Sequence, residues 1–173
     1  MRNTVAFNDK WAFSKEADQV PERMPERWIW VDLPHTWNGI DGQDGGGDYY
    51  RGTCYYANEF RKADLPEGEE YYLEICAANA SADVYVNGAK LAHHDGGYSA
   101  FRVNMTEHLK EENLVVIAVD NGVNERVYPQ QADFTFYGGL YRGVNIVAVP
   151  EAHFELEYYG TPGIKLTPKV NGQ

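Results

Sequence analysis

The sequence predicts an all-β domain, a β-sandwich or jelly roll of about eight to ten antiparallel strands. Short segments with alternating apolar and polar residues recur along the chain, whereas helical periodicity is almost absent. Aromatic residues make up 14% of the 173 residues and include 13 tyrosines, and tyrosine favours the half-buried surface of a sheet. Asn87-Gly88, between two strand-like runs, is a strong hairpin signal. This length suits one domain with a real core and is short for two.

The individual strands follow from the spacing of the apolar residues. The strand after the glycine-rich stretch sends Cys54, Tyr56 and Phe60 to one side, toward the core. Two runs, 113–121 and 143–149, are apolar at nearly every position, as expected for strands covered on both faces. Alternation is clearest in 71–78 (Tyr71, Leu73 and Ile75 inward), 98–105 (Phe101, Val103 and Met105) and 154–159 (Phe154, Leu156 and Tyr158).

Few segments depart from the strand pattern. Residues 106–112 predict a helix of about two turns, with Thr106 as its N-cap. Three long segments, 14–27, 34–51 and 121–142, match no regular element, and loops of this length are usually functional or disordered. The first is charged and lacks aromatic residues, so we interpret it as a surface connector. The other two mix Asp, Asn, Arg and aromatic residues with glycine, which favours functional loops.

Charge and composition exclude several function classes. The formal net charge of −11 argues against a nucleic-acid or anionic-membrane partner, and it is compatible with a neutral ligand such as a sugar. The two cysteines, Cys54 and Cys76, lack zinc-site spacing and are interpreted as two buried thiols. The start has no apolar stretch of signal-peptide length and no transmembrane run occurs, so a cytoplasmic location is expected.

Four motifs, in order, resemble the N-terminal sugar-binding domain of glycoside hydrolase family 2, the family of β-galactosidases and β-glucuronidases. The resemblance covers about residues 3–150. It is carried by "DLPHTWNGIDGQDGGGDYYRGTCYYANEF", "ADVYVNGAKLAHHDGGYSAFRVNMT", "LVVIAVDN" and "DFTFYGGLYRGVNIVAV". Each motif alone is weak, but the four together fall on predicted strands or their ends.

The resemblance implies a domain organisation and a role. Residues 1–151 would be the jelly-roll domain, and 152–173 the beginning of an immunoglobulin-like domain that precedes a (β/α)8 barrel. In this family both catalytic glutamates lie in the barrel, where a retaining glycosidase needs two carboxylates about 5 Å apart. The chain alone is therefore expected to be inactive, without cofactor or metal. Its partners would be the downstream domains, a carbohydrate substrate shared with the barrel, and possible further copies of the full enzyme.

The resemblance also indicates which residues would contact substrate. An aspartate at the Asp133 position contacts the galactosyl hydroxyls in the family's β-galactosidases and lies near a sodium ion. An ionised carboxylate can accept hydrogen bonds from two neighbouring hydroxyls. The alternative is a carboxylate that caps a turn or pairs with Arg142 or Arg126. Arg142 itself is interpreted as a structural arginine, and the preceding Gly138-Gly139 is predicted to turn at positive φ.

The glycine-rich loop 41–50 would supply a second polar contact at the rim of the pocket. Its candidates are Asp41, Asp44 and Asp48, of which we choose Asp44 and Asp48 as substrate-binding residues. The motif "LPHTW" is interpreted as structural, with Trp37 beneath the sandwich and His35 partly buried beside it. The histidines His93, His94 and His108 are interpreted as surface residues.

Three functions remain open from sequence alone. The first is a non-catalytic domain of a family 2 glycosidase, with loops closer to the β-galactosidase type. The second is a free-standing carbohydrate-binding module. The third is a structural or oligomerisation domain, since a jelly roll by itself does not define function.

Overall fold

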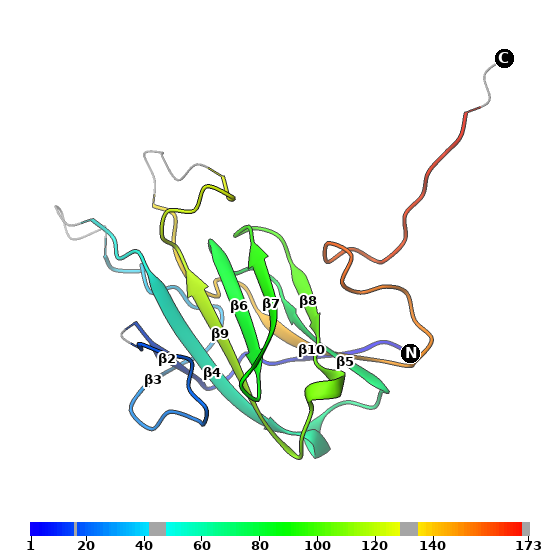
Figure 1. Cartoon of the computed structure of the whole chain (residues 1–173), viewed down its shortest axis with the longest axis horizontal. Helices are drawn as coiled ribbons and strands as arrows, with labels where there is room; N and C mark the ends of the chain where they lie inside the picture. The colour runs from blue at the N-terminus through cyan, green and yellow to red at the C-terminus, as the bar shows by residue number, and fades with distance from the viewer. Residues whose placement is uncertain (16, 42–47, 129–134, 171–173) are drawn as a thin grey trace.

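The predicted β-sandwich is confirmed by the computed structural model, which describes residues 1–15, 17–41, 48–128 and 135–170. These residues form ten strands in two antiparallel sheets (Figure 1). The strands are β1 (Asn3–Ala6), β2 (Trp11–Ser14), β3 (Ile29–Val31), β4 (Thr53–Arg61), β5 (Glu70–Ile75), β6 (Ser81–Val86), β7 (Ala89–Asp95), β8 (Phe101–Asn104), β9 (Glu112–Asp120) and β10 (Val144–Val149). Two short 3-10 turns, η1 (Lys62–Asp64) and η2 (Thr106–His108), connect them.

The connectivity is that of a jelly roll. One sheet has the order β1-β10-β5-β8, and the other has the order β3-β2-β4-β9-β6-β7. From β4 onward the chain crosses between the sheets at each step except the β6–β7 hairpin. This hairpin is the predicted one, because Asn87 (φ 51°) and Gly88 (φ 85°) both adopt the positive φ of a two-residue type I′ turn.

The main core lies between the two sheets. Trp11, Tyr56, Leu73 and Ile117 have no exposed surface there, and burial of each such side chain contributes about 1.5–3 kcal/mol or more. The strand β9 is also covered on its outer face, because Val20, Met24 and Trp28 pack over Ala12, Ala57, Leu114 and Val116. This explains why β9 is apolar at nearly every position. The segment 14–27, interpreted as a plain connector, thus also covers the larger sheet.

The predicted helix at 106–112 is wrong. Only the single turn η2 forms there, and Thr106 makes no side-chain cap. The Thr106 Oγ1 instead accepts a hydrogen bond from the Tyr71 amide of β5 at 2.9 Å. Leu109 packs against the core, but one apolar residue cannot hold a second helical turn against the sandwich.

The predicted strand at 154–159 is also not formed, and the segment packs differently from its alternation. Leu156 is 4% exposed against Tyr72, Val147 and Val149, whereas Phe154 is 68% exposed. Within the described residues no strand pairs with this segment, so its backbone folds into turns. Arg102 of β8 donates hydrogen bonds to the carbonyls of Leu156 and Thr161, both at 3.0 Å. The segment is therefore fastened to the smaller sheet up to about residue 161.

No helix in the described part of the chain is long and apolar enough to cross a membrane. Cys54 and Cys76 are both free thiols; Cys54 is buried, as interpreted, whereas Cys76 is only partly buried. Burial raises the pKa of the Cys54 thiol to about 12, so this cysteine is a core residue and not a nucleophile.

Candidate functional site

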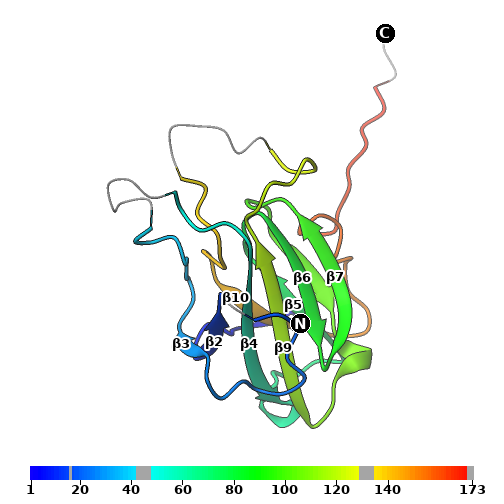
Figure 2. The same ribbon diagram turned by 60° about the vertical axis from the view of Figure 1, so that its left-hand side comes forward.

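Antiparallel pairing brings the two long glycine-containing segments to one end of the sandwich. Thr53 of β4 and Ser81 of β6 both pair with Asp120 of β9, so β4 and β6 begin where β9 ends. The described parts of the segments before β4 and before β10 lie together at this end in both views (Figures 1 and 2). We call it the loop end, made of residues 35–41, 48–52, 121–128 and 135–141.

Asn38 lies at the centre of the loop end without exposed surface. Its Oδ1 accepts hydrogen bonds from the Gly138 amide (2.7 Å) and from Asn121 Nδ2 (3.1 Å). Its Nδ2 donates to Asp41 Oδ2 (2.9 Å) and to the Tyr50 carbonyl (3.0 Å). The side chain thus makes all four hydrogen bonds open to an amide, and it joins the segment before β4 to the segment before β10.

A second buried amide, Asn121, completes this connection from the end of β9. It has no exposed surface, and its Nδ2 also donates to the Tyr50 carbonyl at 3.1 Å. Its Oδ1 accepts from the Gly52 amide at 3.0 Å. Thr36 adds a further bond, because its Oγ1 donates to the Gly138 carbonyl at 2.7 Å. Three stretches of chain are therefore held together by buried, paired polar groups.

Of the four candidate aspartates, the structure describes two, Asp41 and Asp48, and they have different surroundings. Asp41 Oδ2 accepts from the Tyr50 amide (2.9 Å) as well as from Asn38, so it closes the base of the glycine-rich loop. Burial alone would raise the pKa of the Asp41 carboxyl, but these two hydrogen bonds, together with one from its own backbone and the Lys15 charge, hold the pKa below its usual value. Asp48 lies at the exposed edge of the loop end, where its Oδ1 accepts from the Tyr49 amide. Asp44 and Asp133 lie outside the described residues.

An aromatic cleft borders the network on the side of β6. Asn79 pairs through its backbone with Gly139, and its side chain donates to the Tyr137 carbonyl and accepts from the Tyr128 hydroxyl. The cleft encloses about 210 Å³. Its walls come from Thr36, Asn79, Tyr98, Thr135, Phe136, Tyr137 and Tyr141. Tyr98 is 55% exposed and stacks on Tyr128 at 4.8 Å, so a flat apolar surface opens to solvent here.

Two glycines allow the chain to pass this close to the network. Gly139 has a φ of 129°, which confirms the predicted turn at positive φ for this residue. A Cβ on Gly138 would lie 2.1 Å from Cζ2 of Trp37 and 2.8 Å from Nδ2 of Asn121. Only glycine therefore fits between the tryptophan ring and the buried amide.

The motif "LPHTW" is structural, as interpreted. Trp37 is 5% exposed within the main core, and His35 is partly buried at the edge of it. The His35 ring lies 4.7 Å from the Phe13 ring, and its Nδ1 is 2.8 Å from the Tyr56 hydroxyl. Burial lowers the pKa of His35 below its usual value, and the Lys15 charge lowers it further.

This lowered pKa predicts a loss of stability in mild acid. The unfolded chain protonates His35 near pH 6.5, whereas the folded chain does so only at lower pH. The pKa of His94, which stacks on Phe101, is lowered by burial in the same sense. The free energy of unfolding should therefore be highest above pH 7 and fall as the pH drops below about 6.5. Urea unfolding at pH 7.5 and 5.5 measures this, and His35→Gln should show a smaller difference; an unchanged pH dependence would contradict the assignment.

Other charged residues near the loop end have partners of their own. Arg126, considered as a partner for Asp133, lies 3.1 Å from Asp95. His93 contacts Asp83 and Asp95 on the exposed face of β6 and β7. Arg142 is exposed and donates to the Tyr98 carbonyl at 3.1 Å. Among the described residues no group of three or more His, Cys, Asp or Glu side chains could hold a metal ion.

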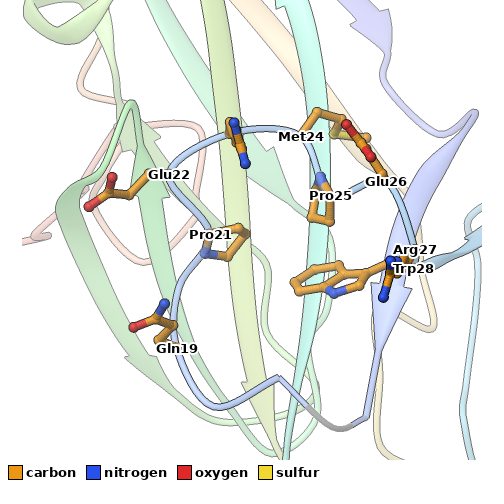
Figure 3. Close-up of a pocket in the computed structure, with 9 residues that line it drawn as sticks. Gln19, Pro21, Glu22, Met24, Pro25, Glu26, Arg27 and Trp28 are labelled. Carbon is orange, nitrogen blue, oxygen red and sulfur yellow. The ribbon is translucent and has the colours of Figure 1, made fainter.

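A larger hollow of about 670 Å³ lies away from the network, inside the loop that covers the larger sheet (Figure 3). It is lined by residues 19 and 21–28, and the Trp28 ring and two prolines face it. Its charged residues alternate in sign, with Glu22 and Glu26 beside Arg23 and Arg27. Such a balanced rim defines no ligand class, so the loop end remains the candidate site.

Sequence reasoning missed the three buried asparagines that organise the loop end. Asn38 and Asn121 occur in the sequence only as parts of longer motifs, and Asn79 stands at the end of a predicted strand. Hydrophobic patterns do not reveal a buried polar residue, because burial then depends on partners far away in the sequence. The available hint of burial in the sequence is position: Asn38 directly follows Trp37, and Asn79 and Asn121 each follow an apolar run.

The fold and the loop end together describe a jelly-roll domain in which buried amides hold the loops of one end together.

No family model matches the chain. A β-glucuronidase of Bacteroides fragilis is 33% identical over 98% of this chain and 24% of its own length. A β-galactosidase of Thermoanaerobacter pseudethanolicus is 26% identical over 91% of the chain and 22% of its own length. The crystal structure of an FMN-binding β-glucuronidase from Facaelibacterium prausnitzii L2-6 has a TM-score of 0.83 and 43% identity, covering 97% of this chain and 26% of that one.

The chain belongs to glycoside hydrolase family 2, as the N-terminal domain of its β-glucuronidases and β-galactosidases. It spans about a quarter of the length of the two β-glucuronidases compared above. The resemblance carried by the four motifs is thereby confirmed.

Proposed function

We propose that the chain is the non-catalytic N-terminal domain of a β-glucuronidase-type hydrolase, and that its loop end completes the rim of the sugar site. The observation that carries this proposal is the coverage of the comparisons. Nearly the whole chain matches β-glucuronidases, while the match accounts for about a quarter of their length. The catalytic carboxylates of the full protein would then lie in a part beyond this domain.

The geometry supports a non-catalytic role. A retaining glycosidase needs one carboxyl group that can act as an acid and another that is free to attack the sugar. Asp41, the carboxylate inside the network, is held ionised by two hydrogen bonds and is used to close the loop. It is a structural group. The exposed Asp48, together with Asp44 and Asp133, is left for contacts to sugar hydroxyls, which ionised carboxylates accept well.

The substrate class that we propose for the full enzyme depends on the comparisons with known proteins. The loops of the sequence suggested the β-galactosidase type, and relatives of both types match this chain, but the FMN-binding β-glucuronidase at 43% identity is more similar than the β-galactosidases at 26% and 34%. We therefore propose β-glucuronides as the substrate class of the full enzyme, with β-galactosides as the alternative.

The substrate role of Asp133 is tested in the full-length enzyme that carries this domain. Asp133→Ala should lower kcat/KM for p-nitrophenyl β-glucuronide by about 100-fold, the scale expected when a positioning contact to substrate is lost. Asp64→Ala is the control, because Asp64 is exposed and pairs with Arg61. The same activity in both variants, with both folded, would contradict the proposal.

The activity of the 173-residue chain alone separates the remaining functions. We expect no turnover of glucuronide or galactoside above background, because the barrel is needed for catalysis. Millimolar binding of glucuronate by the chain alone would instead favour a free-standing carbohydrate-binding module. If the chain alone neither hydrolyses nor binds these sugars, and if Asp133→Ala is fully active in the enzyme, the structural or oligomerisation role is favoured.

We propose three further properties of the protein. The free thiols Cys54 and Cys76 support a reducing, cytoplasmic location. A following immunoglobulin-like domain would begin near residue 152, although the segment around Leu156 packs on the smaller sheet. The full enzyme would assemble into oligomers, and analytical ultracentrifugation of the full-length enzyme checks this.

A further inference from the structure

The side chains at the centre of the buried amide network are polar, and the stability of the fold alone does not require polar side chains there. Asn38 and Asn121 have no exposed surface, yet their side chains are polar. A buried polar network of this kind is often no more stable than a well-packed apolar core, because desolvation offsets the hydrogen bonds. What such a network supplies is a single arrangement of its partners, since each donor and acceptor must be matched.

The partners of Asn38 lie on the two segments that carry the candidate sugar contacts. Through Asp41 and the Tyr50 carbonyl it holds both ends of the glycine-rich loop, and Asp48 lies two residues before Tyr50. Through the Gly138 amide it holds the segment that enters β10. One side chain therefore sets the distance between the two loop bases.

We propose that Asn38 is a positioning residue for the sugar site: it fixes the separation of the two loop bases and acts through Asp41 and Gly138, without contacting substrate. This inference rests on the proposed function of the loop end. It adds that the alignment of the loops depends on the donor and acceptor pattern between residues 38 and 41.

This pattern can be tested from both of its partners. In Asn38→Asp the new carboxylate cannot donate to Asp41, and two negative charges then face each other where a 2.9 Å hydrogen bond was. Asp41 Oδ2 accepts from both Asn38 Nδ2 and the Tyr50 amide, so Asp41→Ala removes the acceptor of both bonds. In Asp41→Asn the side-chain amide oxygen can take the place of Oδ2 and accept both bonds, so the pattern is kept while the charge is removed.

A matched control exists at the opposite end of the sandwich. Asn113 is 2% exposed, and its side chain also makes four hydrogen bonds. Its Oδ1 accepts from the Lys110 amide and from Asn87, and its Nδ2 donates to the carbonyls of Lys110 and Phe60. Asn113→Asp therefore disturbs an equally buried amide far from the loop end.

The test measures kcat, KM and thermal stability of these variants in the full-length enzyme with p-nitrophenyl β-glucuronide. Asn38→Asp should lower kcat/KM by about 10- to 100-fold, as expected for a shift of about 1 Å in a contact to substrate. Asp41→Ala should show a loss of the same order, and Asp41→Asn a much smaller one. Asn113→Asp should lose stability while its kcat/KM, per folded protein, stays within about twofold of the wild type.

The outcomes separate this inference from the function on which it rests. If Asn38→Asp does not fold, the Asp41 variants decide: a folded Asp41→Ala with lowered kcat/KM beside an active Asp41→Asn supports the inference, and equal kcat/KM in these two folded variants overturns it. A folded Asn38→Asp with wild-type kcat/KM also overturns it, even if Asp133→Ala is inactive. If instead Asp133→Ala is fully active while Asn38→Asp and Asp41→Ala are impaired and Asp41→Asn is not, the positioning role stands and the substrate role of Asp133 fails.

Discussion

Replacing Arg102 with methionine is expected to lower the free energy of unfolding by about 3–5 kcal/mol, the usual loss when one partner of a buried ion pair is removed. The Arg102 side chain is 8% exposed, and its Nε donates to Glu74 Oε1 at 2.7 Å. Glu74 is 12% exposed, so the substitution leaves a nearly buried carboxylate with weaker partners. The two bonds to the carbonyls of Leu156 and Thr161 are lost as well, which frees the segment around Leu156.

The pH dependence of this loss follows from Glu74. Burial alone would raise the pKa of Glu74, but hydrogen bonds from Asn145 and Arg102 and the charges of Arg102 and Arg2 outweigh it, so the pKa lies below its usual value. The ionised pair therefore stabilises the fold above about pH 4.5, and this contribution is lost as the pH falls below that value. The difference between wild type and Arg102→Met should be largest at neutral pH and should narrow below pH 4.5.

Urea unfolding at pH 7 and pH 4 measures both parts of this prediction. Arg142→Met is the control, because Arg142 is exposed and its hydrogen bond to the Tyr98 carbonyl should be worth about 1 kcal/mol or less. Limited proteolysis should also cut the Arg102 variant faster in the segment near residue 156. Equal stability of the two variants would show that the Arg102–Glu74 pair contributes little.

Replacing Gly138 with alanine is expected to cost about 2–3 kcal/mol, at the upper end of what overpacking a core usually costs. The added methyl group would lie 2.1 Å from the Trp37 ring, and that ring is held within the main core. It would also press on Asn121 Nδ2, so relief of the clash requires the segment before β10 to move away from Asn38. The variant should therefore lose stability and, in the full-length enzyme, kcat/KM together.

Gly39→Ala is the matched control for this second variant. It lies on the other partner segment of the network, its φ is not in the positive range, and the nearest atom to an added Cβ is 3.8 Å away. Its free energy of unfolding should stay within about 0.5 kcal/mol of the wild type, as is usual for surface substitutions. Melting curves of the two variants, side by side, check the prediction. A neutral Gly138→Ala would mean that the Trp37 ring moves aside easily.

Patterns within short stretches predicted the strands well. The alternation in 71–78 and 98–105 placed Leu73, Ile75, Val103 and Met105 in the core, where they are buried. The continuous apolar run of β9 was explained by covering on both faces, and its outer face is indeed covered. These predictions succeed because side-chain direction in a strand depends only on position along that strand.

The two wrong predictions have the opposite cause. Thr106 and the residues after it carry helical signals, but the Tyr71 amide on a different strand takes the threonine oxygen. The alternation in 154–159 is that of a strand, but Leu156 packs on the smaller sheet and Arg102 binds the backbone there. In both places contacts to residues distant in the sequence override a weak local preference.

By itself, the sequence determined that the chain is an all-β sandwich with two long glycine-containing loops, because the period of apolar residues is a local property. The tertiary structure alone decided that these loops share one end, that Asp41 closes a loop, and that Asn38 and Asn121 hold the loop bases together. Asn38 meets Gly138 across 100 residues of sequence, and such a contact exists only once the strands have paired in register. Burial of a polar side chain is decided by its partners, and partners brought together by folding leave no periodic signal in the chain.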